Sequence, residues 1–224
     1  MKALIFKEFK LALHPVCYIF IILFPFMILI PSYPIGIGFI YVLASYPILF
    51  LGANKGQQSN DLLFSTLMPV RKKDIVLARI VTVIFMQVAF IAITSILYPI
   101  ARIINSNLSN IPNGPSIPGL GLNCYVLLLA IAIVGYALAD LIFFPIYYKN
   151  GRSIVMSTLF TVFGFAIFIA IFTIALPYVP NFDSMKTLPL WLQFILLVVA
   201  ILLSFFIHAV TYKISVKRLE KVDF

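Results

Sequence analysis

Long stretches without charged side chains alternate with short polar segments along this chain. Asp, Glu, Lys and Arg are all absent from five stretches: Leu11–Asn54, Ile80–Ala101, Ile103–Ala139, Ser153–Phe182 and Thr187–Tyr212. Because a helix rises about 1.5 Å per residue, a hydrocarbon core of about 30 Å is crossed by about 20 apolar residues. The pattern therefore predicts helices that span a membrane.

Two of these stretches need further division. The first is long enough for two spans, and two prolines at Pro31 and Pro34 predict a turn between them. The third contains a polar, Pro/Gly-rich segment over residues 105–121, so it contributes one span, which continues past Asp140. We therefore predict an all-α, polytopic membrane protein with six transmembrane helices, over about 13–31, 35–53, 77–103, 122–147, 154–177 and 190–212. The loops at about 104–121 and 178–189 are expected on the outer side.

The composition excludes other classes of protein. The chain has 224 residues, of which 63% are hydrophobic and 10% are charged, with a mean hydropathy of +1.12. A soluble domain carries about 25% charged residues, and a disordered chain needs low hydrophobicity. Neither class fits this sequence.

The basic residues predict the orientation. Of the 16 Lys and Arg residues, all except Arg102 and Lys186 fall on one side of the six predicted spans. The positive-inside rule makes this side cytoplasmic, so both termini are expected in the cytoplasm. The net charge of +9 is then explained by topology and by anionic membrane lipid, and no nucleic-acid partner is expected.

The N-terminal segment, about residues 1–12, has the pattern of a short interfacial helix. On a helix, Lys7 and Lys10 lie on a polar stripe with Phe9 on the opposite side. Glu8 lies on the apolar side, which does not fit this pattern. A basic flank that only sets the topology is the alternative.

The cytoplasmic loop of about residues 54–76 carries large apolar side chains outside the predicted spans. One interpretation is that they return to the membrane interface. The other is a short helix, capped near Asp61 and ended by Pro69, that packs into a groove on a soluble partner. The residues predicted to couple the chain to this partner are Asp61, Leu62, Leu63, Phe64, Leu67, Pro69, Arg71 and Lys72.

This loop resembles the membrane subunits of ABC-2-type ABC transporters in their small six-helix form. The similar sequence is LLFSTLMPVRKKDIVLAR, residues 62–79, in which a serine, a leucine and a Pro-Val-x-Arg pattern precede Ile-Val. It departs from the family pattern at Thr66, at Met68 and at Arg79, where the family has lysine. The segments MKALIFKEFK at 1–10 and FPIYYKNGR at 144–152 are also similar. The helix register of the loop depends on these departures.

The resemblance implies a single permease domain over residues 1–224 in a bacterial cytoplasmic membrane. Such a domain dimerises with a second copy or a sister subunit, and a separate ABC ATPase docks beneath the coupling helix at 61–75. The chain has no G-x-x-x-x-G-K-[ST] phosphate loop. We therefore expect no enzyme activity and no cofactor in this chain, and we expect ATP and Mg²⁺ to be bound by the partner ATPase.

Asp140 is the candidate polar residue within the membrane. An acidic side chain there either lines a polar path or pairs with a basic residue near the cytoplasmic surface, and we favour the pairing. His208 is expected to be a hydrogen-bonded helix residue rather than a ligand. The two His and two Cys residues are too widely separated for a metal site, and no catalytic motif is present.

Three functions remain open. The first is an ATP-driven exporter of an apolar or amphipathic cargo, with a peptide toxin or antimicrobial peptide as the preferred cargo. Its support is the near absence of charge in the spans and the absence of outer loops large enough for a capture domain. The second is an ion-coupled secondary transporter or small channel that uses Asp140. The third is a membrane scaffold that transports nothing.

Overall fold

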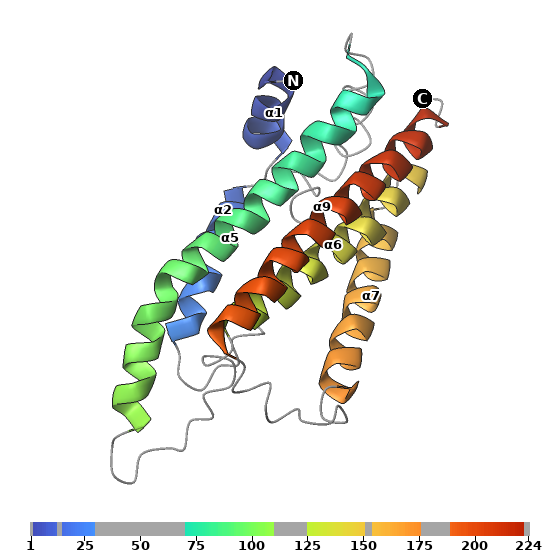
Figure 1. Cartoon of the computed structure of the whole chain (residues 1–224). Helices are drawn as coiled ribbons and strands as arrows, with labels where there is room; N and C mark the ends of the chain where they lie inside the picture. Colours follow the sequence, from blue (N-terminus) through green and yellow to red (C-terminus); the bar gives the residue numbers. More distant parts are fainter. Residues whose placement is uncertain are drawn as a thin grey trace.

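A computed structural model describes residues 2–12, 15–29, 70–109, 125–150, 154–175 and 189–221 of the chain. Every element in these ranges is helical, which agrees with the all-α prediction (Figure 1). In chain order the elements are α1 (Lys2–Lys7), a π-helical turn (Glu8–Ala12), α2 (Pro15–Leu23), a 3₁₀ helix (Phe24–Leu29), α5 (Lys72–Ser109), α6 (Tyr125–Asn150), α7 (Ile154–Ala175) and α9 (Leu190–Glu220).

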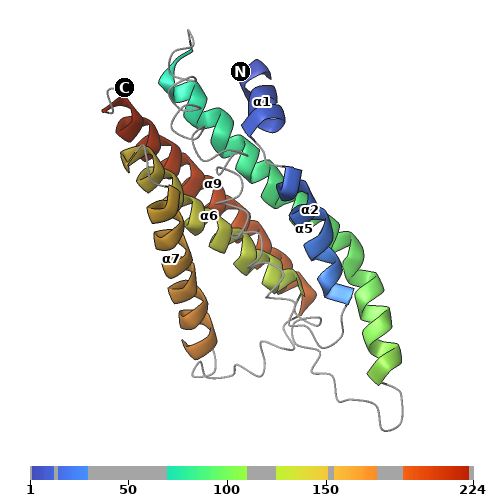
Figure 2. The same cartoon turned by 180° about the vertical axis from the view of Figure 1, so that it is seen from behind.

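The long helices form a row in which each contacts its neighbours. The helix α5 contacts α9, α9 contacts α6, and α6 contacts α7, while α1 and α2 lie against α5 (Figures 1 and 2). Both α5 and α7 run in one direction, and α6 and α9 run in the other. As a result, α1, the first turn of α5 and the last turn of α9 lie at the same end of the bundle. This arrangement fits the predicted topology, whose orientation in a membrane stays a prediction.

Three of the helices are long and apolar enough to cross a membrane. The spanning segments are Lys72–Ala101, Leu129–Lys149 and Leu190–Glu220, and α7 adds the shorter apolar segment Val155–Phe168. Helices are therefore confirmed where the sequence predicts the third, fourth and sixth spans, and α7 is helical over most of the predicted fifth. The span predicted at 35–53 lies outside the described residues, so the number of six spans stays a prediction.

The described part of the first predicted span, 13–31, is not one regular α-helix. It changes to a 3₁₀ helix at Phe24, immediately before Pro25. Proline has no N–H to donate and its ring clashes with the preceding turn, so it disrupts the α-helical ladder. The described part of this predicted span is therefore helical, with a change of helix type at Pro25.

The helix α5 is longer at both ends than the predicted 77–103. It begins at Lys72, where the carbonyl oxygen of Arg71 accepts hydrogen bonds from the backbone N–H groups of Asp74 (2.9 Å) and Ile75 (3.4 Å). Arg71 therefore precedes the first turn, and Asp74 lies within that turn. The helix also continues to Ser109, so residues 104–109, predicted as outer loop, are helical. The remainder of that loop and residues 178–188 lie outside the described residues.

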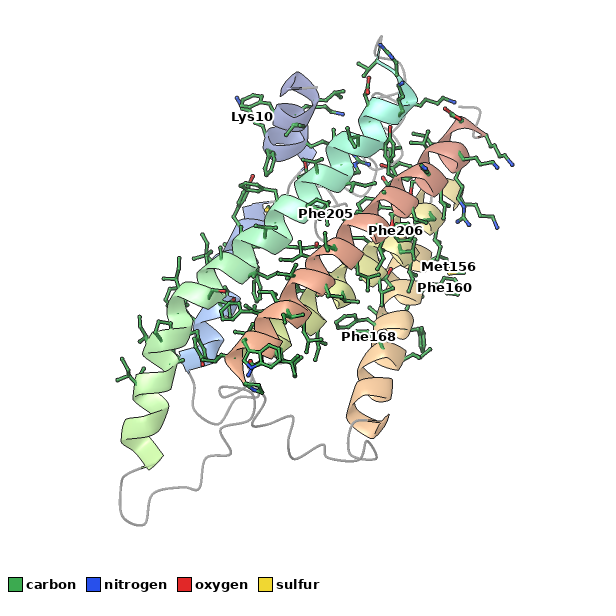
Figure 3. The ribbon with its side chains drawn as sticks, viewed as in Figure 1. Lys10, Met156, Phe160, Phe168, Phe205 and Phe206 are labelled. Atoms are coloured by element: carbon green, nitrogen blue, oxygen red, sulfur yellow. The ribbon has the colours of Figure 1, made fainter. Side chains whose placement is uncertain are left out.

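The polarity of α9 is reversed relative to a helix of a soluble protein. Its buried stripe, which faces its neighbours, is made of Gln193, Ala200, Ile207, Thr211, Ser215 and Leu219. Large apolar side chains such as Phe205 and Phe206 are 72% and 68% exposed on the other side (Figure 3). The Thr211 hydroxyl donates to the carbonyl of Ile207 at 2.9 Å, which satisfies it within the helix. An apolar outer face, with a buried hydroxyl such as that of Thr211 bonded within its own helix, is what a lipid environment requires.

A close approach joins α6 to α7. At Gly135 of α6, a Cβ atom would lie 2.9 Å from Cε2 of Phe165 and 3.2 Å from Cε1 of Phe168. These two rings stack on α7 with centroids 5.9 Å apart. Gly135 thus gives the aromatic pair the space in which it packs, as small residues commonly do between membrane helices.

Candidate functional site

The predicted coupling segment precedes α5, and the structure describes only its end. Asp61, Leu62, Leu63, Phe64, Leu67 and Pro69 lie outside the described residues, so their role stays a prediction. Arg71 is exposed at the start of α5. The ammonium of the half-buried Lys72 reaches the carbonyl oxygen of Leu219, in the last turn of α9, at 3.5 Å. The end of the predicted coupling segment is therefore in contact with α9 as well as continuous with α5.

A second basic side chain joins α9 to α6 at the same end of the bundle. Nη1 of Arg218 donates to the carbonyl oxygen of Pro145 at 2.7 Å. Pro145 lies inside α6, where it cannot donate a backbone hydrogen bond of its own. The last turn of α9 therefore contacts both α5, through Lys72, and α6, through Arg218.

The N-terminal segment packs its apolar side against α5. Leu4 is buried, and the ring of Phe9 meets that of Phe85 edge to face at a centroid distance of 5.2 Å. On the outer side, the ammonium of Lys10 lies 5.5 Å from the centre of the exposed Phe6 ring. The hydroxyl of Tyr18 donates to the carbonyl of Phe9 at 3.0 Å. This segment is therefore docked on the bundle and has one outward face.

Glu8 lies on the inner side of that segment because it has a partner there. Its carboxylate accepts hydrogen bonds from Nε of Arg79 at 3.1 Å and from Nη2 at 3.4 Å, and both side chains are 3% exposed. Nη1 of Arg79 also donates to the hydroxyl of Tyr147 at 2.9 Å. One guanidinium therefore connects the N-terminal segment, α5 and α6.

This connection was not predicted, although the sequence contains two signals for it. An acidic residue on an apolar helix face has to find a cation when it is buried. The guanidinium of Arg79 offers a fork of donors that can serve a carboxylate and a phenol together. The placement of Glu8 that did not fit an interfacial helix is thus explained by Arg79.

Asp140 is fully buried at the junction of three helices. Its carboxylate accepts from Nε2 of Gln87 on α5, at 3.1 and 3.3 Å, and its Oδ2 atom lies 3.0 Å from Nε2 of His208 on α9. These partners differ from the cytoplasmic Lys or Arg that was expected to pair with Asp140. Because Gln87 and His208 lie within hydrogen-bonding distance inside the bundle, the Asp140 side chain does not have to extend toward the membrane surface.

His208 is hydrogen-bonded, as expected. Its Nδ1 atom lies 2.7 Å from the carbonyl oxygen of Ser204 and 3.2 Å from the Ser204 hydroxyl. The sequence analysis missed Gln87, although it is among the most polar residues inside its charge-free stretch. The rule that buried polar groups pair with one another would have joined Gln87, Asp140 and His208.

The described helices thus combine lipid-facing apolar surfaces with buried polar contacts between helices. Within the ranges that the structure describes, no group of three or more His, Cys, Asp or Glu side chains is arranged to hold a metal ion. These features define an integral, multi-pass membrane protein.

A family model with the description "ABC-2 family transporter protein" matches residues 3–218, and the chain belongs to this family. No curated protein and no solved structure matches the chain. The ABC-2 membrane subunits have no ATPase activity, typically bind no cofactor, and associate with an ABC ATPase. The chain is therefore the membrane component of an ABC-2 transporter, and the expectation that it is not itself an enzyme is confirmed by its family.

Proposed function

We propose that this chain is the permease half of an ATP-driven exporter in a bacterial cytoplasmic membrane. In this proposal it has six spans with both termini in the cytoplasm and dimerises with a second copy or a sister subunit. The partner ATPase docks beneath the segment at 61–75. ATP binding and hydrolysis in the partner move this segment, and the attached helices open and close the path for cargo as rigid bodies.

The observation that carries the proposal is the continuity between the coupling segment and the bundle. Lys72 is the last residue of the predicted ATPase contact and the first residue of α5, a helix of 38 residues. Its side chain also reaches the last turn of α9 at Leu219. A displacement of the segment before Lys72 is therefore passed to α5 through the backbone and to α9 through this contact.

The N-terminal segment offers a second connection at the same end of the bundle. Through Glu8, Arg79 and Tyr147 it is bonded to α5 and α6. An ATPase that contacts the exposed side of this segment, near Lys10, would act on the same helices.

The cargo that we propose is apolar or amphipathic, with a peptide toxin or an antimicrobial peptide as the preferred example. Among the described residues, the buried Asp, Glu, Lys and Arg side chains are Glu8, Arg79 and Asp140, and each has a partner within the protein. Buried charged groups that already pair within the protein bind an ionic cargo only weakly.

An ion-coupled transporter or small channel is the second candidate. The observation in its favour is the burial of Asp140 beside His208 within membrane-length helices. The association of the family with an ABC ATPase favours the first candidate. The two candidates differ in their energy source, since an ion-coupled transporter works without an ATPase and an ATP-driven exporter does not.

The test is to purify the chain in mild detergent and to measure ATPase activity and partner retention. We expect an ATPase to co-purify with the wild-type chain, and we expect Leu67→Asp to release it without unfolding the helices. The matched control is Gln58→Asp, which adds the same charge to the same loop without removing an apolar side chain. Retention of the ATPase by Leu67→Asp would contradict the proposed coupling segment.

A further inference from the structure

The distances around His208 call for one proton more than an ordinary histidine–carboxylate contact holds. Nδ1 of His208 lies 2.7 Å from the carbonyl oxygen of Ser204, and a carbonyl oxygen can only accept a hydrogen bond. The short distance therefore places a proton on Nδ1. In a neutral imidazole with its proton on Nδ1, the other nitrogen, Nε2, is an acceptor.

Asp140, the other member of this contact, is also a hydrogen-bond acceptor. The Asp140 carboxylate receives hydrogen bonds on both oxygens from the amide of Gln87, and Oδ2 lies 3.0 Å from Nε2 of His208. Two acceptors at this distance repel each other unless a proton lies between them. The contact accordingly needs a second proton, in addition to the one on Nδ1.

We propose that Asp140 and His208 together form a proton-binding site within the membrane domain, which holds a single exchangeable proton. The proton resides on Nε2, as an imidazolium–carboxylate pair, or on Oδ2, as an imidazole–carboxylic acid pair. Both arrangements are neutral overall, which suits burial. When the proton leaves to solvent, a carboxylate charge and an imidazole lone pair face each other, and the hydrogen bond between α6 and α9 is lost.

Among the residues that the structure describes, few other titratable side chains lie on the helix turns that carry this site. Within one helical turn of these three residues, the only other titratable side chains are Tyr136 on α6 and Tyr212 on α9. Phenols keep their protons near neutral pH, so they do not compete for this one. On α5, Arg79 lies two turns from Gln87 and is paired with Glu8. The described residues of α7 contain no titratable side chain.

The proposal predicts how pH acts on the helix contact. The hydrogen bond between Asp140 and His208 is present while the proton is bound, and it is lost as the pH rises through the value at which the proton leaves. The proposal concerns the chain at rest and does not depend on export, so it can fail without affecting the proposed function.

The test is ¹⁵N NMR of the full chain, labelled at histidine and placed in phospholipid nanodiscs, between about pH 5 and about pH 9. The chain has two histidines, so His14→Gln leaves His208 as the only signal. We expect Nδ1 to carry a proton throughout, and we expect Nε2 to lose its shared proton in one titration step. A neutral ring protonated on Nε2, with a bare Nδ1 that accepts from the Ser204 hydroxyl, would overturn the proposal.

Two variants sharpen this experiment. Asp140→Asn replaces the proton-bound acid by an amide that donates to Nε2, so we expect this titration step to disappear while Nδ1 stays protonated. Ser204→Ala removes the hydroxyl and keeps the carbonyl, so we expect the step to remain unchanged. Loss of the step in Ser204→Ala, or an unchanged step in Asp140→Asn, would overturn the proposal.

A stability measurement gives a readout that does not depend on labelling. In the wild-type chain, we expect the thermal unfolding midpoint to fall by about 2–4 °C across the same titration step, the shift expected for the loss of one hydrogen bond. In Asp140→Asn we expect no such fall. Equal pH dependence in the two proteins would contradict the proton site.

Discussion

Glu8 and Arg79 form a buried ion pair that fastens the N-terminal segment to α5, with 3.1 Å between the carboxylate and Nε of the guanidinium. Neither side chain is more than 3% exposed. The two residues are separated by 71 positions in the sequence, so the pair fixes a tertiary contact and is not part of a local helix pattern.

Removal of one member of this pair is expected to be costly. Glu8→Ala leaves the Arg79 guanidinium buried without its carboxylate, and we expect a loss of about 3–5 kcal/mol in the free energy of unfolding. Thermal unfolding in detergent measures this loss. Glu220→Ala, which removes the same charge at an exposed position, is the control and should change stability little.

The same pair can be tested by removal of both charges. Glu8→Gln combined with Arg79→Met leaves no buried ion, so the double variant should recover much of the stability that Arg79→Met or Glu8→Gln loses alone. Losses that simply add would show that the two side chains do not interact.

Gly135 and Gly164 should respond differently to alanine. In a helix interior, Gly→Ala normally stabilises by about 1 kcal/mol. At Gly135 the new Cβ meets the edges of two stacked rings, Phe165 and Phe168, and such overpacking costs about 1–3 kcal/mol. At Gly164 it meets only the terminal methyl of Ile142, which can rotate away.

We therefore expect Gly135→Ala to lower the thermal unfolding midpoint and Gly164→Ala to leave it unchanged or raise it. If both variants raised the midpoint equally, the packing of α6 on α7 described above would be wrong.

Arg218 should matter more than its neighbour Lys217. Arg218 donates to the carbonyl of Pro145 at 2.7 Å and is half-buried, whereas Lys217 is exposed. We expect Arg218→Ala to cost about 1 kcal/mol and Lys217→Ala to change stability by less than about 0.5 kcal/mol. Chemical denaturation of the two variants in detergent provides the comparison. Equal losses of stability would show that the contact between Arg218 and Pro145 does not stabilise the protein.

Much of the helical structure was predictable because the absence of charge is a strong signal in a membrane protein. The helices α6 and α7 lie close to their predicted ranges, whereas α9 continues eight residues past its predicted end at 212, to Glu220. The prediction for α5 was too short, because its first turn is built from Lys72, Lys73 and Asp74 and continues beyond the apolar segment. Hydropathy marks the part of a helix that lies in lipid and gives no information on where the helix ends in water.

The polar contacts were less predictable, because they depend on how each helix is rotated against its neighbours. Asp140 was identified as the polar residue of its span, but Gln87 and His208 were not predicted as its partners. His208 lies 68 residues away in sequence, and only the packing of α9 on α6 brings it to Asp140. Glu8 and Arg79 are likewise 71 positions apart in sequence, and only the packing of the N-terminal segment on α5 brings them together.

The proposed topology can be tested by labelling from one side of the membrane. After Cys17 and Cys124 are replaced by serine, single cysteines are introduced at Gln58, Ser116 and Lys221. In intact cells, we expect a membrane-impermeant thiol reagent to label Ser116→Cys and to leave Gln58→Cys and Lys221→Cys unlabelled until the membrane is opened. Labelling of Lys221→Cys in intact cells would contradict a cytoplasmic C-terminus.

The central claim is that a partner ATPase drives export through this chain, and reconstituted transport tests it most directly. The measurement is the movement of a fluorescent amphipathic peptide in liposomes that contain either the purified chain alone or the chain with its co-purified ATPase. The account predicts peptide movement only when the ATPase, ATP and Mg²⁺ are all present, and its loss in Leu67→Asp. Transport by the chain alone, driven by a proton gradient and abolished by Asp140→Asn, would contradict it.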